Sequence, residues 1–489
     1  MNEFLNNNIK VETINNIFPD SLISFIPDKN LGAIHFIGIG GIGMSGLARL
    51  LLAKGYSVTG SDKAANTFTD DLEKLGAKIF IGHDAANISS QQLCVVSTAI
   101  IRENPELVKI NSLNIPVWHR SKLLKFLSQN QKLIGISGTH GKTTTTGMIS
   151  SLLLEAGLDP SIIIGGYLSD INSNSRTGFS DYFVAEIDES DKSHIDQDSY
   201  ISLVTNIEAD HLENYPGGLA DIYDSMVKFA NKASHKIIFC SDNKGCLDIV
   251  SDLKKPYISY GYNRENFQPD FYFKNLNSGS MEVYYKGELL GPVNLKVPGH
   301  HNKLNALAAI AVAYNLDIPF TKVQNALAQF NGVGRRFDIK GIVNNMLIVD
   351  DYAHHPTEVA STIDAAIEYM QYSNRYLRDI HPRLDRLVVV FQPHQPKRLM
   401  DLFDEFCKCF VKADLVLMAD VYIARGKEIP NVNSANLVDK MQHSNAYYLG
   451  GNLDSLYENC LPLLQPNDLV ITMGAGDITN LGVKFLQNA

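Results

Sequence analysis

The sequence predicts an α/β protein that is built on parallel sheets and divided into about three domains. From Ala33 onward, short apolar runs alternate with helical patterns, which is typical of parallel strands covered by helices. Two of these series begin with a glycine-rich loop, at Gly38 and at Gly138, and a third series begins near Asn344. The length of 489 residues is also that of about three domains of ordinary size.

Composition and charge exclude several classes of protein. Hydrophobic residues make up 45% of the chain and charged residues 20%, which is ordinary for a soluble globular protein. The net charge of −10 argues against nonspecific binding to nucleic acid or to a membrane surface. The N-terminus does not have the pattern of a signal peptide, and no apolar run reaches the length of a membrane span. We therefore expect a cytoplasmic protein with neither nucleic acid nor membrane as a partner.

The six cysteines are scattered and form no CxxC pair, so we expect free thiols in a reducing compartment. Only Cys407 and Cys409 lie close together. Their one-residue gap is not the usual spacing of zinc ligands, and the residues from Leu402 to Cys407 favour an amphipathic helix over a zinc site.

Changes of pattern along the chain indicate domain boundaries near residues 130 and 340. The polar stretch Ser128–Lys132 precedes the second α/β series, and the third series follows residue 340. Alternating runs with turn residues over Phe271–Pro298 predict antiparallel hairpins that decorate the second domain. The predicted organisation is an N-terminal extension over residues 1–31 and three domains over residues 32–130, 131–340 and 341–489.

The first glycine-rich loop reads GIGGIG and lies between a predicted strand over Ala33–Ile37 and a helix that ends at Gly55. A second strand is predicted over Tyr56–Thr59, and an acidic residue follows the loop by about 20 residues. Glycines let the backbone approach a pyrophosphate, the helix N-terminus favours an anion, and the carboxylate can accept a ribose hydroxyl. The pattern predicts a dinucleotide or sugar-nucleotide site at Gly38, Gly40, Gly41, Gly43 and Asp62. The alternative is a tight turn whose glycines serve only helix packing.

The second glycine-rich loop reads GTHGKTT and lies between a predicted strand over 133–137 and a helix that ends at Gly157. It is similar to a P-loop, although Ile136 stands where the first glycine of the strict pattern would be. Backbone amides of such a loop hold phosphates, its lysine neutralises their charge, and its hydroxyl can bind Mg²⁺. The pattern predicts a nucleoside triphosphate site at Gly138, Thr139, His140, Gly141, Lys142, Thr143 and Thr144. The alternative is a threonine-rich helix start with a solvated lysine.

Candidate metal ligands follow two later apolar runs. The sequence AEIDESD places Glu186 and further carboxylates at the end of a predicted strand, where they could bind the magnesium of a bound triphosphate or simply form a solvated loop. His211 follows the run VTNIEAD, and a single histidine in such a place is usually structural.

The motifs, taken in order, resemble the ATP-dependent Mur ligases of peptidoglycan synthesis. They read HFIGIGGIGMSGLA, GTHGKTTTT, AEIDESD, TNIEADHL, PGHHNKLNALAA, GVGRRFD, DDYAHHPTE, FQPH and MGAGDI, and they cover nearly the whole chain after residue 31. The resemblance implies a Rossmann-like UDP-binding domain, a central P-loop ATPase domain and a Rossmann-like C-terminal domain. It also implies ligation of L-alanine to the lactyl carboxylate of UDP-N-acetylmuramate, with ATP giving ADP and phosphate, and two Mg²⁺ ions.

The resemblance further implies roles for single residues. The catalytic residues would be Lys142 on the ATP phosphates, His211 and Arg336, which reaches the γ-phosphate. Thr143 and Glu186 would bind one Mg²⁺ and His211 the second. Asn302, Asn305 and Asp351 would contact ATP, and the first glycine-rich loop would hold UDP rather than NAD. The amino acid would be bound by His355, His394 and Arg398.

Several of these residues also have a purely structural interpretation. Asn302 and Asn305 could cap the alanine-rich helix that follows, the pair Arg335-Arg336 could be a solvated basic patch, and the segment from His354 could be a capped helix start with Pro356 at its first position. The chain also departs from the family pattern at Lys192 and His194, and at the Gln395-Pro396-Lys397 that follows FQPH.

Four questions stay open at this point. The sequence does not identify the general base that takes the amine proton, for which His211, His355 and His394 are candidates. The chain is a monomer or a weak homodimer. A sister ligase that adds a recycled tripeptide to the same sugar nucleotide shares most of the motifs, although FQPH favours the alanine enzyme. An NAD-dependent oxidoreductase and a noncatalytic nucleotide-binding regulator are alternatives from other classes, but neither explains both glycine-rich loops with their retained charged residues.

Overall fold

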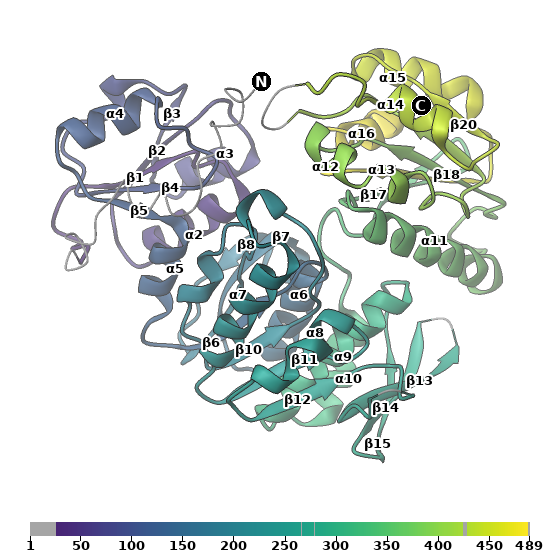
Figure 1. Cartoon of the computed structure of the whole chain (residues 1–489), viewed down its shortest axis with the longest axis horizontal. Coiled ribbons are helices and arrows are strands. Elements are labelled where there is room, and N and C mark those ends of the chain that lie inside the picture. Colours follow the sequence, from purple (N-terminus) through teal and green to yellow (C-terminus); the bar gives the residue numbers. More distant parts are fainter. Residues whose placement is uncertain (1–25, 266, 278, 424–427, 488–489) are drawn as a thin grey trace. The chain divides into compact units, whose positions relative to one another are not determined.

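The computed structural model describes residues 26–489 except 266, 278, 424–427 and 488–489. The chain forms two compact units, and the ribbons of both are drawn in Figure 1. The first unit contains the chain up to Phe273 together with Val283–Gly291 and Leu304–Leu327; the second contains Lys274–Glu282, Pro292–Lys303 and the chain from Ala328. Within the described ranges, no helix has the length and apolar character that a membrane span needs. Most of the predicted N-terminal extension, residues 1–25, lies outside the described residues.

The first unit begins with a parallel five-stranded sheet of order β3-β2-β1-β4-β5. Strands and helices alternate as the sequence predicts, because each parallel strand needs a crossover to reach the next. The elements are β1 (Ile34–Ile37), α2 (Ile42–Ala53), β2 (Val58–Asp62), α3 (Thr67–Lys74), β3 (Lys78–Ile81), β4 (Leu93–Val96), α4 (Pro105–Ser112), β5 (Val117–His119) and α5 (Arg120–Ser128).

The predicted strand Tyr56–Thr59 begins two residues later in the structure. Helix α2 ends at Gly55, which has a left-handed φ of +84°. The amide of Gly55 donates to the Leu52 carbonyl over 2.9 Å, and the amide of Tyr56 donates to the Leu51 carbonyl over 3.0 Å. This pair of bonds is the Schellman motif, so Tyr56 still serves the helix end and the strand starts at Val58.

A buried carboxylate lies in this sheet domain. Glu106, at the start of α4, has no exposed surface. Its carboxylate accepts hydrogen bonds from the Ser61 hydroxyl over 2.5 Å and from Asn87 Nδ2 over 2.7 Å, and His35 Nε2 lies 3.7 Å away. Burial by itself would raise the pKa of Glu106, but nearby His35 and the bonds from Ser61 and Asn87 lower it to about 2.

This carboxylate predicts a pH dependence of stability. An unfolded glutamate titrates near pH 4.5, so the stabilisation is complete above that pH and is lost as the pH falls towards 2. Chemical denaturation of the unaltered chain and of Glu106→Gln should therefore give free energies of unfolding whose difference shrinks by about 2 kcal/mol between pH 6 and pH 3. The exposed Glu103→Gln is the matched control. A difference that stays constant over this range would contradict the assignment.

The second sheet has ten strands in the order β15-β14-β13-β12-β11-β10-β6-β9-β7-β8. Consecutive strands β13, β14 and β15 are neighbours, as the predicted hairpins require. The elements are β6 (Lys132–Ser137), α6 (Lys142–Glu155), β7 (Ser161–Leu168), β8 (Ser173–Arg176), β9 (Tyr182–Glu186), β10 (Ile201–Val204), α7 (Leu219–Asn231), β11 (Lys236–Cys240), α8 (Lys244–Asp248), β12 (Tyr257–Tyr260), β13 (Phe271–Asn277), β14 (Ser280–Tyr285), β15 (Glu288–Asn294), α9 (His300–Asn315) and α10 (Phe320–Gln329).

The centre of this sheet decides where the functional loops meet. Strand β6 lies between β9 and β10 and is parallel to both. Ile136 pairs with Glu186 on one side, and Ser137 pairs with Val204 on the other, so the three strands end at the same level. The loops that follow them, which carry the lysine, the acidic cluster and His211, therefore leave the sheet at one edge.

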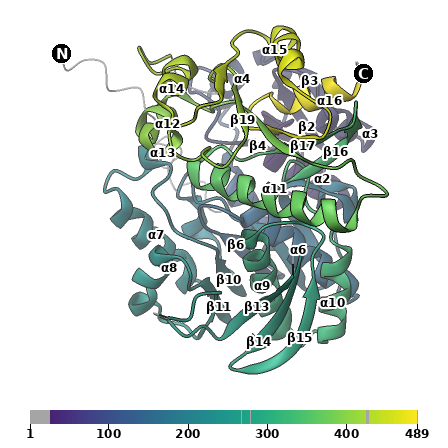
Figure 2. The same cartoon turned by 90° about the vertical axis from the view of Figure 1, so that its right-hand side faces the viewer.

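The second unit is built on a six-stranded sheet of order β16-β17-β21-β18-β19-β20, in which only β16 is antiparallel to its neighbour. Figure 2 shows the long helix α11 running along this sheet. The elements are β16 (Asp338–Val343), β17 (Met346–Asp351), α11 (Pro356–Tyr376), β18 (Arg386–Phe391), α12 (Pro396–Asp401), α13 (Phe403–Phe406), β19 (Leu415–Met418), α14 (Ser434–Lys440), β20 (Ala446–Tyr448), α15 (Leu453–Cys460), β21 (Asp468–Met473) and α16 (Thr479–Gln487).

Both faces of this sheet are buried, as expected for parallel strands covered on two sides. On β18, Val389 and Phe391 join the core beneath α11, whereas Val388 and Val390 join the core beneath α15 and α16. The amphipathic stretch before Cys407 forms the short helix α13, which buries Phe406 against this core. All six cysteines are free thiols, as the sequence predicts.

Candidate functional site

The first glycine-rich loop connects β1 to α2 and is held by the end of β2. The amides of Gly38 and Ile39 donate to the Ser61 carbonyl over 2.8 and 2.9 Å. Gly38 has a left-handed φ of +81°, and a Cβ atom at Gly40 would lie only 2.6 Å from Asn66 Nδ2. The loop thus needs glycine both for its conformation and for close packing, which leaves its backbone open to a ligand.

Asp62, at the end of β2, holds this loop in place through its carboxylate. Its Oδ2 accepts the amide of Gly40 over 2.8 Å and its Oδ1 accepts the amide of Lys63 over 2.7 Å. The structure therefore gives Asp62 a role in ordering the loop, and a contact with a ribose hydroxyl stays a prediction.

The second loop connects β6 to α6 and is tied to the end of β10. Gly138 has φ +129°, and a Cβ atom there would lie 2.3 Å from Thr205 Oγ1. The amide of Thr139 donates to the Asn206 carbonyl over 3.1 Å, and the amide of His140 donates to Asn206 Oδ1 over 2.8 Å. Gly141 is the left-handed N-cap of α6, with φ +79°. Strand, loop and helix therefore follow one another as the sequence predicts, in the geometry that phosphate-binding loops have.

Lys142 lies at the first position of α6 and turns back over the loop. Its ammonium donates to the carbonyls of Gly138 over 2.5 Å and Thr139 over 3.1 Å, and it pairs with the Glu189 carboxylate over 2.9 Å. Only 14% of the lysine side chain and 6% of the glutamate side chain are exposed. Burial by itself would lower the pKa of Lys142, but Glu189, Asp188 and Glu186 raise it, so the ammonium stays charged.

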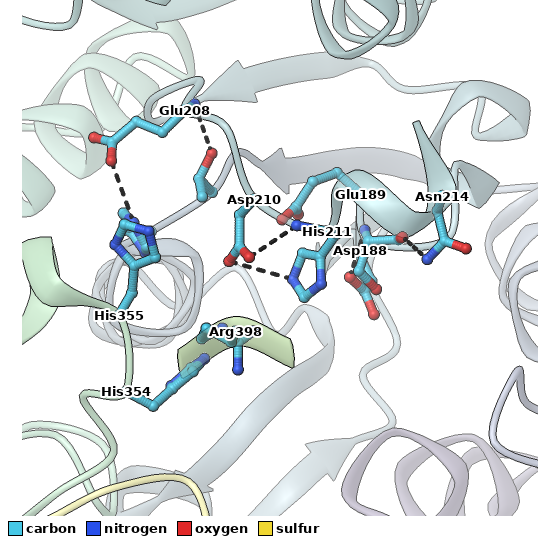
Figure 3. A network of polar contacts seen from close by, with 12 residues as sticks. Asp188, Glu189, Glu208, Asp210, His211, Asn214, His354, His355 and Arg398 are labelled. Carbon is cyan, nitrogen blue, oxygen red and sulfur yellow. Dashed lines mark hydrogen bonds and ion pairs between the residues drawn. The ribbon is translucent and has the colours of Figure 1, made fainter. Parts of the chain in front are cut away.

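The acidic loop after β9 is held in a defined shape. The Tyr215 hydroxyl donates to the Glu189 carbonyl over 2.5 Å, and Asn214 Nδ2 donates to the Ser190 carbonyl over 2.8 Å. Figure 3 shows Asp188 and Glu189 of this loop, with Asn214 from the segment after β10 beside them. The predicted alternative of a solvated loop is therefore wrong for Glu189, which is buried against the P-loop lysine.

Glu186 and Thr143 carry side-chain oxygens that could bind a metal ion, and both lie near the same edge of the sheet. Glu186 ends β9, and its Oε2 accepts the amide of Gly165 over 2.9 Å. Thr143 is buried in the first turn of α6. A hydroxyl and a carboxylate suit a hard cation such as Mg²⁺.

His211 lies in the loop after β10, among acidic side chains. It has a left-handed φ of +53°. Its Nε2 lies 3.5 Å from Asp210 Oδ2, and the Asp210 carboxylate also accepts the His211 amide over 2.8 Å (Figure 3). Its Nδ1 lies 3.8 Å from Glu213 Oε1. In the same segment, Glu208 pairs with His140 of the P-loop over 3.5 Å. The histidine is thus positioned by carboxylates rather than by apolar packing.

The two asparagines of the GHHNKLN motif lie inside α9, so the predicted alternative of capping residues is wrong. Asn305 Oδ1 accepts the Thr145 hydroxyl over 3.2 Å and would lie 2.7 Å from a Cβ atom at Gly141. The structure thus brings Asn305 against the P-loop. Asn302 belongs to the second unit, where its Nδ2 donates to the Pro298 carbonyl over 2.7 Å.

The adjacent arginines of the second unit have different surroundings. Arg335 Nη2 donates to the carbonyls of Gly474 over 2.6 Å and Gly476 over 3.2 Å, and its Nε pairs with buried Asp350 over 3.3 Å. Arg336 stacks on the Tyr352 ring at 5.0 Å and lies 3.8 Å from Glu358. Arg335 therefore stabilises the fold, whereas Arg336 has the weaker tether.

Asp351 is buried beside this pair. Its carboxylate accepts the amides of Phe337 over 2.7 Å and Ala353 over 2.8 Å, which fixes the backbone next to Arg336. Burial raises the pKa of Asp351 to about 6. Its contact with ATP stays a prediction.

The three residues expected to bind the amino acid also lie in the second unit. His355 is the N-cap of α11, with Glu358 completing a capping box and Pro356 at the first position, so the predicted capped helix start is confirmed. Arg398 Nη1 lies 3.3 Å from His394 Nδ1, and the His394 ring stacks on Tyr422. The structure brings His394 and Arg398 together.

Sequence reasoning missed three residues at these sites. Glu189 was only one carboxylate of a cluster, and its burial against Lys142 singles it out. His354 packs edge-on against His394, with ring centroids 5.9 Å apart, and burial lowers its pKa to about 3. Arg120 precedes the P-loop domain and carries no motif, so no local signal could have marked it.

The chain has a P-loop with a buried lysine and carboxylates, and a second glycine-rich loop of another type. Together these features define a nucleotide-dependent enzyme. Three family models match successive segments: the Mur ligase family catalytic domain over residues 33–132, the Mur ligase middle domain over 136–313, and the Mur ligase glutamate ligase domain over 335–476. The chain belongs to the Mur ligase family. The α/β fold predicted from the sequence is confirmed, while the exact boundaries near residues 130 and 340 stay predictions.

Among curated proteins, the chain is 41% identical over 472 residues to the UDP-N-acetylmuramate–L-alanine ligase of Trichlorobacter lovleyi. The aligned region covers 94% of this chain and 99% of the relative. It is 42% identical to the protein of the same name from Carboxydothermus hydrogenoformans, covering 94% and 97%. Among solved structures, it is similar to the UDP-N-acetylmuramate–alanine ligase MurC of Thermotoga maritima, with a TM-score of 0.78, 27% identity, and coverage of 93% and 98%.

Proposed function

We propose that this chain joins L-alanine to the lactyl carboxylate of UDP-N-acetylmuramate at the expense of ATP, a step of peptidoglycan precursor synthesis in the cytoplasm. The names of the similar ligases supply the substrates. Within the molecule, the observation that carries the proposal is the charged, buried Lys142 held over the P-loop by Glu189. That arrangement serves phosphoryl transfer and has no use in hydride chemistry.

The chemistry begins with a poor electrophile, because a carboxylate resists attack by an amine at neutral pH. Attack of the lactyl carboxylate on the γ-phosphorus of ATP forms an acyl phosphate and releases ADP. The neutral amine of alanine then attacks the acyl carbon, and phosphate leaves to give the amide. Lys142 and Arg336 would neutralise the charge that develops on the transferred phosphoryl group.

Two Mg²⁺ ions belong to this proposal. Thr143 and Glu186 offer the oxygen donors that suit one ion, and His211 with its neighbouring carboxylates would hold the second. Bound ions would supply further positive charge at the phosphates. An imidazole nitrogen is a less usual ligand for Mg²⁺ than an oxygen. The carboxylates of Asp210 and Glu213 beside His211 would therefore be the main ligands of the second ion.

The remaining assignments complete the sites. The glycine-rich loop from Gly38 to Gly43 would hold the UDP part of the sugar nucleotide, with Asp62 keeping the loop in shape. Asn305 would contact the ATP from α9, as would Asn302 and Asp351 from the second unit. Arg398 would bind the carboxylate of alanine with His394 beside it. His355 would also contact the amino acid. We expect a monomer or a weak homodimer.

Phosphate release from ATP tests the function directly. The unaltered chain is incubated with Mg·ATP and UDP-N-acetylmuramate, with and without L-alanine, glycine, L-serine or the tripeptide L-Ala-γ-D-Glu-diaminopimelate. We expect release that needs both the sugar nucleotide and L-alanine. Release that occurs with the tripeptide but with none of the single amino acids would identify the recycling ligase instead. Absence of release with every acceptor would contradict the proposal.

A further inference from the structure

Arg120 begins helix α5, and its guanidinium lies between two loops of the first unit. On one side, a Cβ atom at Gly43, the last glycine of the first motif and the second residue of α2, would lie 3.5 Å from Arg120 Nη1. On the other side, Arg120 Nη2 donates to Asp188 Oδ2 over 2.5 Å and lies 3.4 Å from Asp191 Oδ2. One nitrogen thus faces the glycine-rich loop and the other faces the acidic loop.

The acidic loop continues to the P-loop. Asp188 is followed directly by Glu189, whose carboxylate pairs with Lys142 over 2.9 Å. The Asp188 side chain also accepts the Ser190 amide over 2.9 Å, so its position sets the backbone of the loop. A displacement of Arg120 would therefore be transmitted to the partner of the phosphate-binding lysine through two adjacent residues.

The elements around Arg120 are firmly placed, so that the guanidinium is the part free to respond. Helix α5 is anchored to the segment after the acidic loop, because Gln197 Nε2 donates to the Ser121 carbonyl over 2.9 Å and Lys125 Nζ donates to the Asp196 carbonyl over 2.8 Å. Helix α2 is anchored to β8 through Asn174, whose Nδ2 donates to the Ile42 carbonyl over 2.6 Å. The two helices thus keep their places, while the arginine can redistribute its bonds between the glycine-rich loop and the acidic loop.

The charges around Arg120 indicate how its guanidinium would respond to a bound diphosphate. Asp188, Glu189 and Asp191 carry three negative charges against the positive charges of Arg120 and Lys142. A diphosphate on the glycine-rich loop would lie at the N-terminus of α2 and attract the guanidinium. Asp188 would then be released in part from Arg120 and become available to the cations that accompany ATP.

We infer that Arg120 is a positioning residue that couples the sugar-nucleotide loop to the ATP loop, so that the diphosphate-containing substrate raises the affinity for Mg·ATP. The inference rests on the proposed function for the identity of the two ligands. Because coupling between two sites is reciprocal, ATP should raise the affinity for the sugar nucleotide by the same factor.

Isothermal titration calorimetry tests the coupling on the whole chain. The magnesium complex of the non-hydrolysable analogue AMP-PNP is titrated with and without saturating UDP-N-acetylmuramate. For the unaltered chain we expect the sugar nucleotide to tighten analogue binding by about 10-fold, within the usual range of coupling between sites. We expect Arg120→Met to reduce that factor to below about 2 and Arg120→Lys, which keeps the charge but not the planar fork, to retain a part of it.

A matched control and a folding check keep the test decisive. Lys122→Met removes an exposed cation from the same helix, whose ammonium lies 5.0 Å from the Trp118 ring, and leaves both anchoring bonds of α5 in place; it should leave the coupling factor unchanged. Thermal unfolding confirms that each variant is folded; a merely structural arginine would lower the melting temperature and leave the coupling factor intact. Unchanged coupling in Arg120→Met, or none in the unaltered chain, overturns this inference alone if turnover is normal. Absence of turnover in the unaltered chain overturns the proposed function and this inference with it.

Discussion

Replacing Lys142 with methionine should lower kcat by at least about 1,000-fold, because the variant loses the charge that neutralises the transferred phosphoryl group. It should also cost about 3 kcal/mol of unfolding free energy, since Glu189 would be left buried without its partner. Steady-state phosphate release and urea denaturation measure the two effects.

The double variant Lys142→Met/Glu189→Gln separates these effects. Removing the stranded carboxylate should restore most of the stability and none of the activity. Lys228→Met, which removes an exposed lysine paired with Asp224 on α7, is the control and should change neither. Recovery of activity in the double variant would mean that Lys142 serves only to balance Glu189.

Replacing Arg336 with methionine should lower kcat by about 100-fold or more, with the unfolding free energy changed by less than about 1 kcal/mol. The reason is its light tether: the side chain rests on the Tyr352 ring and lies 3.8 Å from Glu358, whereas Arg335 is held by short bonds to two carbonyls. Arg336→Lys should recover only part of the activity, because lysine lacks the planar fork that binds phosphate oxygens.

The neighbouring arginine gives the matched comparison. Arg335 is bonded to the Gly474 and Gly476 carbonyls and to buried Asp350, so Arg335→Met should lose about 3 kcal/mol of stability and keep kcat within about 10-fold. Denaturation and phosphate release on both variants check the contrast. If the two variants exchange these effects, the roles assigned to the pair are wrong.

Local patterns in the sequence were sufficient to place the two glycine-rich loops, but not to predict every strand boundary or the residues that contact the loops. Both glycine-rich loops lie between a strand and a helix as predicted, because the apolar runs and the glycine helix ends are local signals. The start of β2 was wrong by two residues, since the bond from the Tyr56 amide to Leu51 extends the helix end. That bond depends on the exact backbone geometry after Gly55, which composition does not encode.

Roles that depend on contacts between distant segments could not be read from the sequence. The predicted contact of Asp62 with a ribose stays a prediction, whereas its bond to the Gly40 amide became visible only in the structure. Two adjacent arginines look alike in sequence, but only Arg335 meets the carbonyls that follow β21. Arg120 precedes the acidic loop that it contacts by about 70 residues, and only the fold brings them together.

Isotope transfer tests the central claim that ATP activates the carboxylate of the sugar nucleotide. UDP-N-acetylmuramate labelled with ¹⁸O in the lactyl carboxylate is turned over with Mg·ATP and L-alanine, and the released phosphate is analysed by mass spectrometry. Attack of the carboxylate on the γ-phosphorus predicts one ¹⁸O atom in each phosphate, with the alanyl amide formed in equal amount. Phosphate that carries no label would show that water had hydrolysed the ATP, and would contradict the account.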